Sequence, residues 1–351
     1  MVRRKIYAWL LRRWYGSRPI GLFIPLAGLF AVLTAVRRWC YRYGIFYVVE
    51  LPVPVIVVGN ITVGGTGKTP FVIWLTLSLQ KQGFRPGIIA RGYGGRSKHW
   101  PLLVRSETDP VMAGDEAVLL ATRTQVPVCA GPDRVQAAHY LLQQTTVNVI
   151  VSDDGLQHYR LGRDLSVIML DGRRYLGNGW RLPAGPLRES AARLEEADIV
   201  ICKTDTTTDT VSPERALAMH MPLQTAISIT DGLRRPLAEF SSRPVHALAG
   251  IGHPQQFFDT LGRHGLHVDG RAFPDHAELS QADLTFSDDA PVLMTEKDAI
   301  KCRGMHLLHH WYVPVTAEFN EQDAAHILNT IRRMLMAKGV LPANSSTLKK
   351  V

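Results

Sequence analysis

A glycine-rich segment followed by Lys-Thr is the part of this sequence best suited to chemistry. Gly64-Gly65-Thr66-Gly67-Lys68-Thr69 follows the apolar run Val55–Val58 and precedes another that begins at Phe71. Glycines let successive backbone N–H groups converge on phosphate oxygens, and a helix N-terminus adds favourable partial charge. Lys68 would then reach the β- and γ-phosphates of a nucleotide, and the Thr69 hydroxyl would hold Mg²⁺. The sequence therefore predicts a phosphate-binding loop between a buried strand and a helix.

The predicted loop departs from the common pattern at one position. That pattern opens with glycine five residues before the Gly-Lys pair, where this chain has Thr62. The alternative is a glycine-rich turn that binds nothing. Nucleotide binding is favoured because the strand, the loop, the Lys-Thr pair and the helix all agree. The predicted nucleotide-binding residues are Thr62, Val63, Gly64, Gly65, Thr66, Gly67, Lys68 and Thr69.

Two acidic pairs downstream of the loop are candidate metal ligands or bases. Asp153-Asp154 follows the apolar run Val147–Val151, where an acid that supports Mg²⁺ belongs in a P-loop site. The alternative for this pair is turn formation or helix capping. The pair in Gly114-Asp115-Glu116 precedes an apolar helix, and acidic side chains also stabilise the first turn of a helix. Asp115 and Glu116 can therefore be either a base or metal ligand, or acids that stabilise the start of the helix.

The elements that must position these residues form an alternating series. Short apolar runs read as buried strands at 87–90, 126–130, 147–151, 165–170 and 198–202, and a helix is expected over 132–144. Continuous apolar strands separated by helices predict an α/β fold: a mostly parallel sheet with helices on both faces. Ligands of such sheets bind beyond the carboxyl ends of the strands, where the motifs above lie.

The pattern loosens near 230–244, which we interpret as a linker. A smaller α/β unit is expected beyond it, with strands at 245–249, 292–295 and 311–315 and a closing helix from Glu321 to about Ala337. The predicted organisation is a membrane-associated segment at 1–45, a nucleotide-binding core at 46–229, the linker at 230–244 and the smaller domain at 245–351.

Charge and hydrophobicity at the N-terminus predict contact with a membrane. The chain of 351 residues is 46% hydrophobic and has a net charge of +9, which nucleic acid or an anionic membrane could explain. The uncharged stretch Ile20–Val36 lies between basic segments that also carry Trp and Tyr, which favours a membrane-seeking helix or helical hairpin. The stretch is slightly short for spanning, and Pro25 interrupts it. A cleaved signal peptide and a buried core helix are the alternatives.

Further motifs extend over almost the whole chain. They are Arg91-Gly92-Tyr93-Gly94, Gly131-Pro132-Asp133-Arg134, Asp153-Asp154-Gly155-Leu156-Gln157-His158, Pro183-Ala184-Gly185-Pro186-Leu187-Arg188-Glu189, Asp275-His276 and Thr295-Glu296-Lys297-Asp298. Together with the Gly59–Pro70 loop and Gly114-Asp115-Glu116, they resemble the tetraacyldisaccharide 4'-kinase family, the lipid A 4'-kinases of Gram-negative bacteria. Thr62 in the loop also fits that family.

The resemblance implies a P-loop kinase-like core, a second α/β/α domain and an ATP-dependent lipid kinase. The implied reaction transfers the γ-phosphate of ATP, with Mg²⁺, to the 4'-hydroxyl of tetraacyldisaccharide 1-phosphate and gives lipid IVA. By motif match Asp115 is the base, His276 orients it, and Lys68 is the third catalytic residue. The implied metal ligands are Thr69, Glu116, Asp153 and Asp154, and the implied substrate residues are Arg134, His158, Arg188 and Glu189.

The expected partners are the lipid substrate and a membrane surface, with no nucleic acid and no protein partner. The expected location is the cytoplasmic face of the bacterial inner membrane, peripheral or monotopic. Two other functions are the alternatives: a membrane-bound P-loop switch, and a GTPase or nucleotide-dependent chaperone. Membrane-bound P-loop switches would carry an extra lysine at Val63, and GTPases would carry asparagine at Cys202. Both signals are absent, and phosphate transfer to a lipid acceptor would separate the kinase from both.

Overall fold

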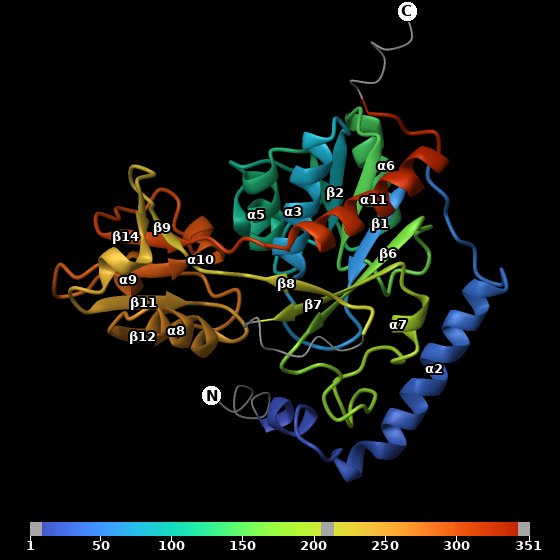
Figure 1. Cartoon of the computed structure of the whole chain (residues 1–351), viewed down its shortest axis with the longest axis horizontal. Helices are drawn as coiled ribbons and strands as arrows, with labels where there is room; N and C mark the ends of the chain where they lie inside the picture. The colour runs from blue at the N-terminus through green and yellow to red at the C-terminus, as the bar shows by residue number, and fades with distance from the viewer. Residues whose placement is uncertain (1–8, 205–213, 343–351) are drawn as a thin grey trace, which may run out of the picture.

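The computed structural model describes residues 9–204 and 214–342, which form two lobes built on two sheets (Figure 1). The first sheet has eight strands in the order β3-β4-β2-β5-β1-β6-β7-β8. Its strands are β1 (Val55–Gly59), β2 (Pro86–Ala90), β3 (Leu102–Val104), β4 (Val128–Ala130), β5 (Val149–Asp153), β6 (Leu165–Asp171), β7 (Ile199–Thr204) and β8 (Leu217–His220). All neighbouring pairs are parallel except β3 with β4. The predicted mostly parallel sheet is confirmed.

Helices cover both faces of the first sheet, because each central strand is apolar on both sides. In β1 and β5 every residue is buried, as a parallel sheet between two helical layers requires. Between β1 and β7 the chain forms the helices α3 (Lys68–Lys81), α4 (Pro110–Ala113), α5 (Asp115–Thr124), α6 (Arg134–Gln144) and α7 (Arg193–Glu196). The residues of α3 and α5 pack in one hydrophobic cluster, and those of α6 pack in the cluster on the opposite face.

The second sheet has six strands in the order β10-β9-β14-β13-β11-β12. Its strands are β9 (Thr225–Ser228), β10 (Arg234–Pro236), β11 (Val245–Ala249), β12 (Val268–Ala272), β13 (Val292–Thr295) and β14 (His310–Val313). The short helices η2 (Leu237–Phe240), α8 (Pro254–Arg263), α9 (Gln281–Leu284) and α10 (Glu296–Lys301) cover it. The clusters on its two faces contain α8 on one side and α9 with α10 on the other, so this lobe is also layered.

Two features differ from the predicted boundaries. The second sheet begins at Thr225, and β10 lies inside the segment expected to be a linker, where it pairs antiparallel with β9. Helix α11 (Glu321–Ala337) forms where a closing helix was expected, but it crosses back to the first lobe (Figure 1). Its stripe Ile327, Ile331 and Leu335 is fully buried in the cluster that contains α3. An amphipathic stripe predicts burial without saying against which sheet.

The N-terminal apolar segment forms the short η1 (Gly21–Phe23) and then α2 (Ile24–Arg42), which lies along the outside of the first lobe (Figure 1). Pro25 lies in the first turn of α2, where proline is favoured, so it starts the helix and does not interrupt it. Ala27 is the only residue of α2 that is buried. Among the described residues, Gly21–Arg42 is the one helical segment long and apolar enough to cross a membrane. A buried core helix is therefore excluded.

Candidate active site

The predicted phosphate loop lies at one side of a cavity of about 1120 Å³ between the two lobes. Residues from both lobes line this cavity, including Lys68, Asp154, His276 and Lys297. Lys68 and Asp154 follow the carboxyl ends of β1 and β5, as expected for a parallel sheet. The residues that the sequence singled out in different parts of the chain therefore meet at one site.

The loop has the backbone geometry that a phosphate site needs. Gly67 caps α3 with φ +79°, a left-handed conformation that favours glycine, and a Cβ there would lie 2.8 Å from Met219 Cε. Lys68, the first residue of α3, donates to Asn60 Oδ1 at 3.1 Å. Asn60 in turn donates to the Thr62 carbonyl at 2.8 Å. This bonding holds the Lys68 ammonium at the loop, and Asn60 was not among the predicted site residues.

The Asp153-Asp154 pair lies beside Lys68. The Lys68 ammonium is 3.4 Å from Asp154 Oδ1, and Arg188 Nη1 is 3.5 Å from Asp154 Oδ2. Burial raises the pKa of Asp154, but Lys68 and Arg188 outweigh it, so this pKa lies below its usual value. Asp154 has φ +50°, which is uncommon for a residue with a side chain and is typical of functional sites.

Several buried oxygens at this site suit a divalent cation. Thr66 Oγ1 and Asp153 Oδ1 are buried without a hydrogen-bond partner, and Asp154 Oδ1, also buried, faces the Lys68 ammonium at 3.4 Å. Burial and then the Glu116 charge raise the pKa of Asp153 to about 7. A bound cation would coordinate the buried oxygens and would offset the cost of burying a charged Asp153 carboxylate. No group of three or more His, Cys, Asp or Glu side chains that could hold a metal occurs among the described residues. Mg²⁺ often needs only one or two carboxylates with substrate phosphates, so the Asp153-Asp154 pair fits it.

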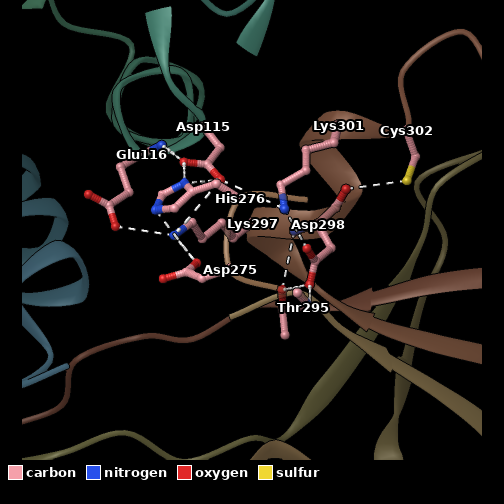
Figure 2. Close-up of polar contacts among 10 residues, drawn as sticks. Asp115, Glu116, Asp275, His276, Thr295, Lys297, Asp298, Lys301 and Cys302 are labelled. Carbon is pink, nitrogen blue, oxygen red and sulfur yellow. Dashed lines mark hydrogen bonds and ion pairs between the residues drawn. The ribbon is translucent and has the colours of Figure 1, made fainter. Parts of the chain in front are cut away.

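Asp115 and His276 face each other across the two lobes (Figure 2). His276 Nδ1 is 3.0 Å from both carboxylate oxygens of Asp115. Asp115 is the first residue of α5 and follows Gly114, whose φ of +86° and close approach to the Tyr93 carbonyl require glycine. Burial raises the pKa of Asp115, but the His276 hydrogen bond and then Lys297 outweigh it and hold that pKa below its usual value. The carboxylate is therefore ionised near neutral pH.

Lys297, at the start of α10, lies among acidic side chains from both lobes (Figure 2). Its ammonium is 3.1 Å from Asp275 Oδ1, 3.3 Å from Glu116 Oε1 and 3.8 Å from Asp115 Oδ2. Burial lowers the pKa of Lys297, but Glu116 and then Asp115 more than offset it, so this pKa is raised. Lys297 was not among the predicted site residues. The sequence signal that could have identified Lys297 is the Thr295-Glu296-Lys297-Asp298 motif at the end of a predicted strand.

The predicted substrate residues divide into a buried pair, Arg134 and Glu189, and a partly exposed pair, Arg188 and His158. Arg134 is 1% exposed and donates to the Gly131 and Asp153 carbonyls, so it supports the Asp153 strand end. Glu189 is also buried and accepts from Tyr159 at 2.6 Å and Gln157 at 3.0 Å.

Arg188 and His158 are the more accessible members of that set. Arg188 lines the cavity and contacts Asp154. Burial, followed by the charges of Arg134 and Arg91, lowers the pKa of His158 to about 4, so this imidazole is neutral near pH 7.

A parallel sheet, a glycine loop that opens a helix with Lys-Thr, and a strand-end carboxylate pair beside that lysine define a P-loop nucleotide-binding protein. The second lobe, which brings His276 to the same cavity, is the feature that separates this chain from a single-lobed P-loop protein.

Comparisons with known proteins identify the family. The family model described as LpxK, tetraacyldisaccharide-1-P 4'-kinase, matches residues 20–333. The chain is 46% identical to a tetraacyldisaccharide 4'-kinase of Nitrosococcus oceani, covering 94% of this chain and 96% of the relative. It is 50% identical to the tetraacyldisaccharide 4'-kinase of Alkalilimnicola ehrlichii, over 84% and 87% of the two chains. The chain belongs to the tetraacyldisaccharide 4'-kinase family.

A solved structure agrees with this assignment. The crystal structure of LpxK from Aquifex aeolicus in complex with ATP matches with a TM-score of 0.77 and 29% identity. The match covers 89% of this chain and 98% of that one. The predicted family and fold class are both confirmed.

Proposed function

We propose that the protein transfers the γ-phosphate of ATP to the 4'-hydroxyl of a tetraacyldisaccharide 1-phosphate. The observation that carries this proposal is His276, which lines the same cavity as the phosphate loop and lies 3.0 Å from the buried Asp115 carboxylate. An acceptor hydroxyl needs a base, and an acceptor other than water needs room beside the transferred phosphate. Family membership specifies which acceptor this is.

In this proposal Asp115 accepts the proton of the 4'-hydroxyl. Its carboxylate is ionised, and His276 holds it through Nδ1. Because the two residues come from different lobes, the base is complete only when the lobes are together. His276 has φ +58°, an uncommon conformation that supports a functional role for this residue.

The cationic side chains of the first lobe would stabilise the transferred phosphoryl group. Lys68 and Arg188 both lie within 3.5 Å of Asp154, so they are oriented toward one point of the cavity. Preorganised cations lower the barrier because they need not reorganise as charge develops on the phosphate oxygens.

Thr69, Glu116, Asp153 and Asp154 are the proposed residues for Mg²⁺. A bound Mg²⁺ would neutralise charge on the phosphate oxygens. In the structure Glu116 points to Lys297 of the second lobe at 3.3 Å, whereas Asp153 Oδ1 is buried without a hydrogen-bond partner and Asp154 lies beside the loop residue Lys68. These two aspartates are therefore the stronger candidates.

Replacing Asp153 by asparagine is expected to raise the Mg²⁺ concentration for half-maximal activity. We expect an increase of about 10–100-fold, the scale seen when the support of a metal site is lost. The measurement is activity against Mg²⁺ concentration at saturating ATP, with the KM for ATP at saturating Mg²⁺ as the control. An unchanged Mg²⁺ dependence in folded Asp153→Asn would remove Asp153 from the metal site.

The outer face of α2 is the proposed membrane contact, on the cytoplasmic side where ATP is available. Leu26, Leu29 and Leu33 are each more than half exposed on this helix. Arg38 pairs with Glu196, and Thr34 accepts from Arg181 at 3.3 Å, so the opposite side of α2 is tied to the protein. A helix held on one side and apolar on the other suits the interface of a bilayer.

Replacing Leu26, Leu29 and Leu33 together by glutamine is expected to weaken binding to anionic vesicles by about 10²-fold or more. Each leucine that leaves an apolar environment costs about 1.5 kcal/mol or more. The measurement is sedimentation with vesicles at matched protein concentration. The control replaces Leu233, Leu308 and Leu341, which are also exposed but lie outside α2, by glutamine. Equal losses in both variants would contradict a specific role for α2.

The direct test of the function is incubation of the purified protein with labelled ATP, Mg²⁺ and the disaccharide 1-phosphate in detergent. The expected product carries the label at the 4' position, as mass spectrometry and partial hydrolysis can show. Release of label only as inorganic phosphate would contradict the proposal and favour a nucleotide-dependent switch.

A further inference from the structure

The two lobes meet where α10 packs on α5, and ionic contacts lie toward both ends of α5. Near its C-terminal end, Arg123 Nη1 lies 2.7 Å from Glu296 Oε2. At its N-terminal end, Lys297 reaches Glu116 and Asp115. Glu296 and Lys297 are consecutive residues of α10, so two neighbouring side chains reach different parts of α5. One of these contacts lies beside the Asp115–His276 pair and the other does not.

The Lys297 ammonium joins the two segments that carry the pair. It contacts Asp275, the chain neighbour of His276, at 3.1 Å, and Glu116, the chain neighbour of Asp115, at 3.3 Å (Figure 2). Asp275 Oδ1 also lies 3.6 Å from His276 Nε2. An ammonium has three donors, which matches the three carboxylates around it.

Lys301 does not have the same bridging position. Its ammonium is 2.8 Å from Asp298 and 3.8 Å from Asp115. Asp298 accepts from Thr295 Oγ1 at 2.6 Å and from the Gly250 amide at 2.8 Å, both in the second lobe. Lys301 is therefore anchored within its own lobe, whereas Lys297 has close partners in both (Figure 2).

We propose that Lys297 is a positioning residue for phosphoryl transfer, which sets the separation of His276 and Asp115 by binding Asp275 in one lobe and Glu116 in the other. This inference rests on the proposed function of the pair. A displacement of about 1 Å at a reacting group can cost about 10²-fold in rate, so a residue that sets this separation affects kcat. Lys297 therefore affects catalysis indirectly, by positioning the Asp115–His276 pair.

The test compares Lys297→Met with Lys297→Arg and with Arg123→Met. We expect Lys297→Met to lower kcat by about 10–100-fold while the KM for ATP changes by less than about threefold. Lys297→Arg keeps the charge and should recover part of the loss. Arg123→Met removes an ion pair from the same α5–α10 interface without touching the Asp115–His276 pair, so its kcat should stay within about threefold of the unmutated protein.

A second measurement separates positioning from general support of the interface. When Lys297→Met is added to His276→Ala, kcat should fall by less than about threefold relative to His276→Ala alone. The reason is that the effects of substituting residues that act as a unit are not additive. If Lys297→Met does not fold, Lys297→Gln replaces it in every comparison.

Three results would overturn the positioning role: an unchanged kcat in the Lys297 variants, an equal loss in Arg123→Met, or a full further loss in the His276→Ala background. Failure of the unmutated protein to phosphorylate the lipid would instead overturn the proposed function. The two failures are therefore distinguishable in the same assay.

Discussion

Replacing Lys68 by alanine is expected to lower kcat by about 10²–10³-fold, the scale of losing one preorganised electrostatic donor. The Lys68 ammonium is held at the phosphate loop by Asn60 Oδ1 at 3.1 Å and by Asp154 Oδ1 at 3.4 Å. Its charge is therefore already in place before the phosphoryl group moves. The measurement is phosphate transfer to the lipid acceptor under saturating ATP and Mg²⁺.

The same helix supplies a matched control for that experiment. Lys68 is the first residue of α3 and Lys81 is its last, and Lys81 is exposed at the end remote from the loop. Lys81→Ala should keep near-normal activity, and the thermal unfolding of both variants checks that they are folded. Near-normal turnover in a folded Lys68→Ala protein would refute the assignment of this loop to nucleotide phosphates.

Removing either Asp115 or His276 is expected to lower kcat by about 10²–10⁴-fold, the usual contribution of general acid–base catalysis. The affinity for ATP should change much less, because a base acts in the transition state and not in nucleotide binding. His276 Nδ1 lies 3.0 Å from both Asp115 oxygens, so the two side chains form one hydrogen-bonded unit.

The double variant Asp115→Ala/His276→Ala gives the sharper result. It should be barely worse than the worse single variant, because each single change already disables the unit. The kcat of the unmutated protein, the two single variants and the double variant is measured with the lipid acceptor. His267→Ala serves as a control because His267 is an exposed histidine of the same lobe as His276. Fully multiplicative losses would show that Asp115 and His276 have independent roles.

The sequence predicted the local structure of the first lobe well. β1, the loop and α3 formed where the apolar run, the glycines and Lys-Thr placed them, because each of these signals is local. α11 also runs from Glu321 to Ala337 as expected. The position of Pro25 was interpreted less well, since the same residue can interrupt a helix or begin one, and the apolar run alone does not say which.

Elements that depend on distant partners could not be placed in the same way. β10 is a short, exposed edge strand whose partner β9 provides its hydrogen bonds, so Arg234–Pro236 shows little apolar pattern of its own. α11 could have packed on either sheet, and the fully buried Ile327, Ile331 and Leu335 decide for the first lobe. For such elements the deciding energy is the burial of side chains against residues far away in the chain.

By itself, the sequence determined the family, the α/β class, the phosphate loop and the chemistry its residue types can perform, since each motif and each apolar run is a local pattern along the chain. Only the tertiary structure placed His276 at 3.0 Å from Asp115, 161 residues away in the chain, and Lys297 between Asp275 and Glu116. Likewise, only packing left the outer face of α2 exposed while Arg134 and Glu189 became buried. Distances and burial depend on how the two lobes pack, and no local pattern of residues encodes that packing.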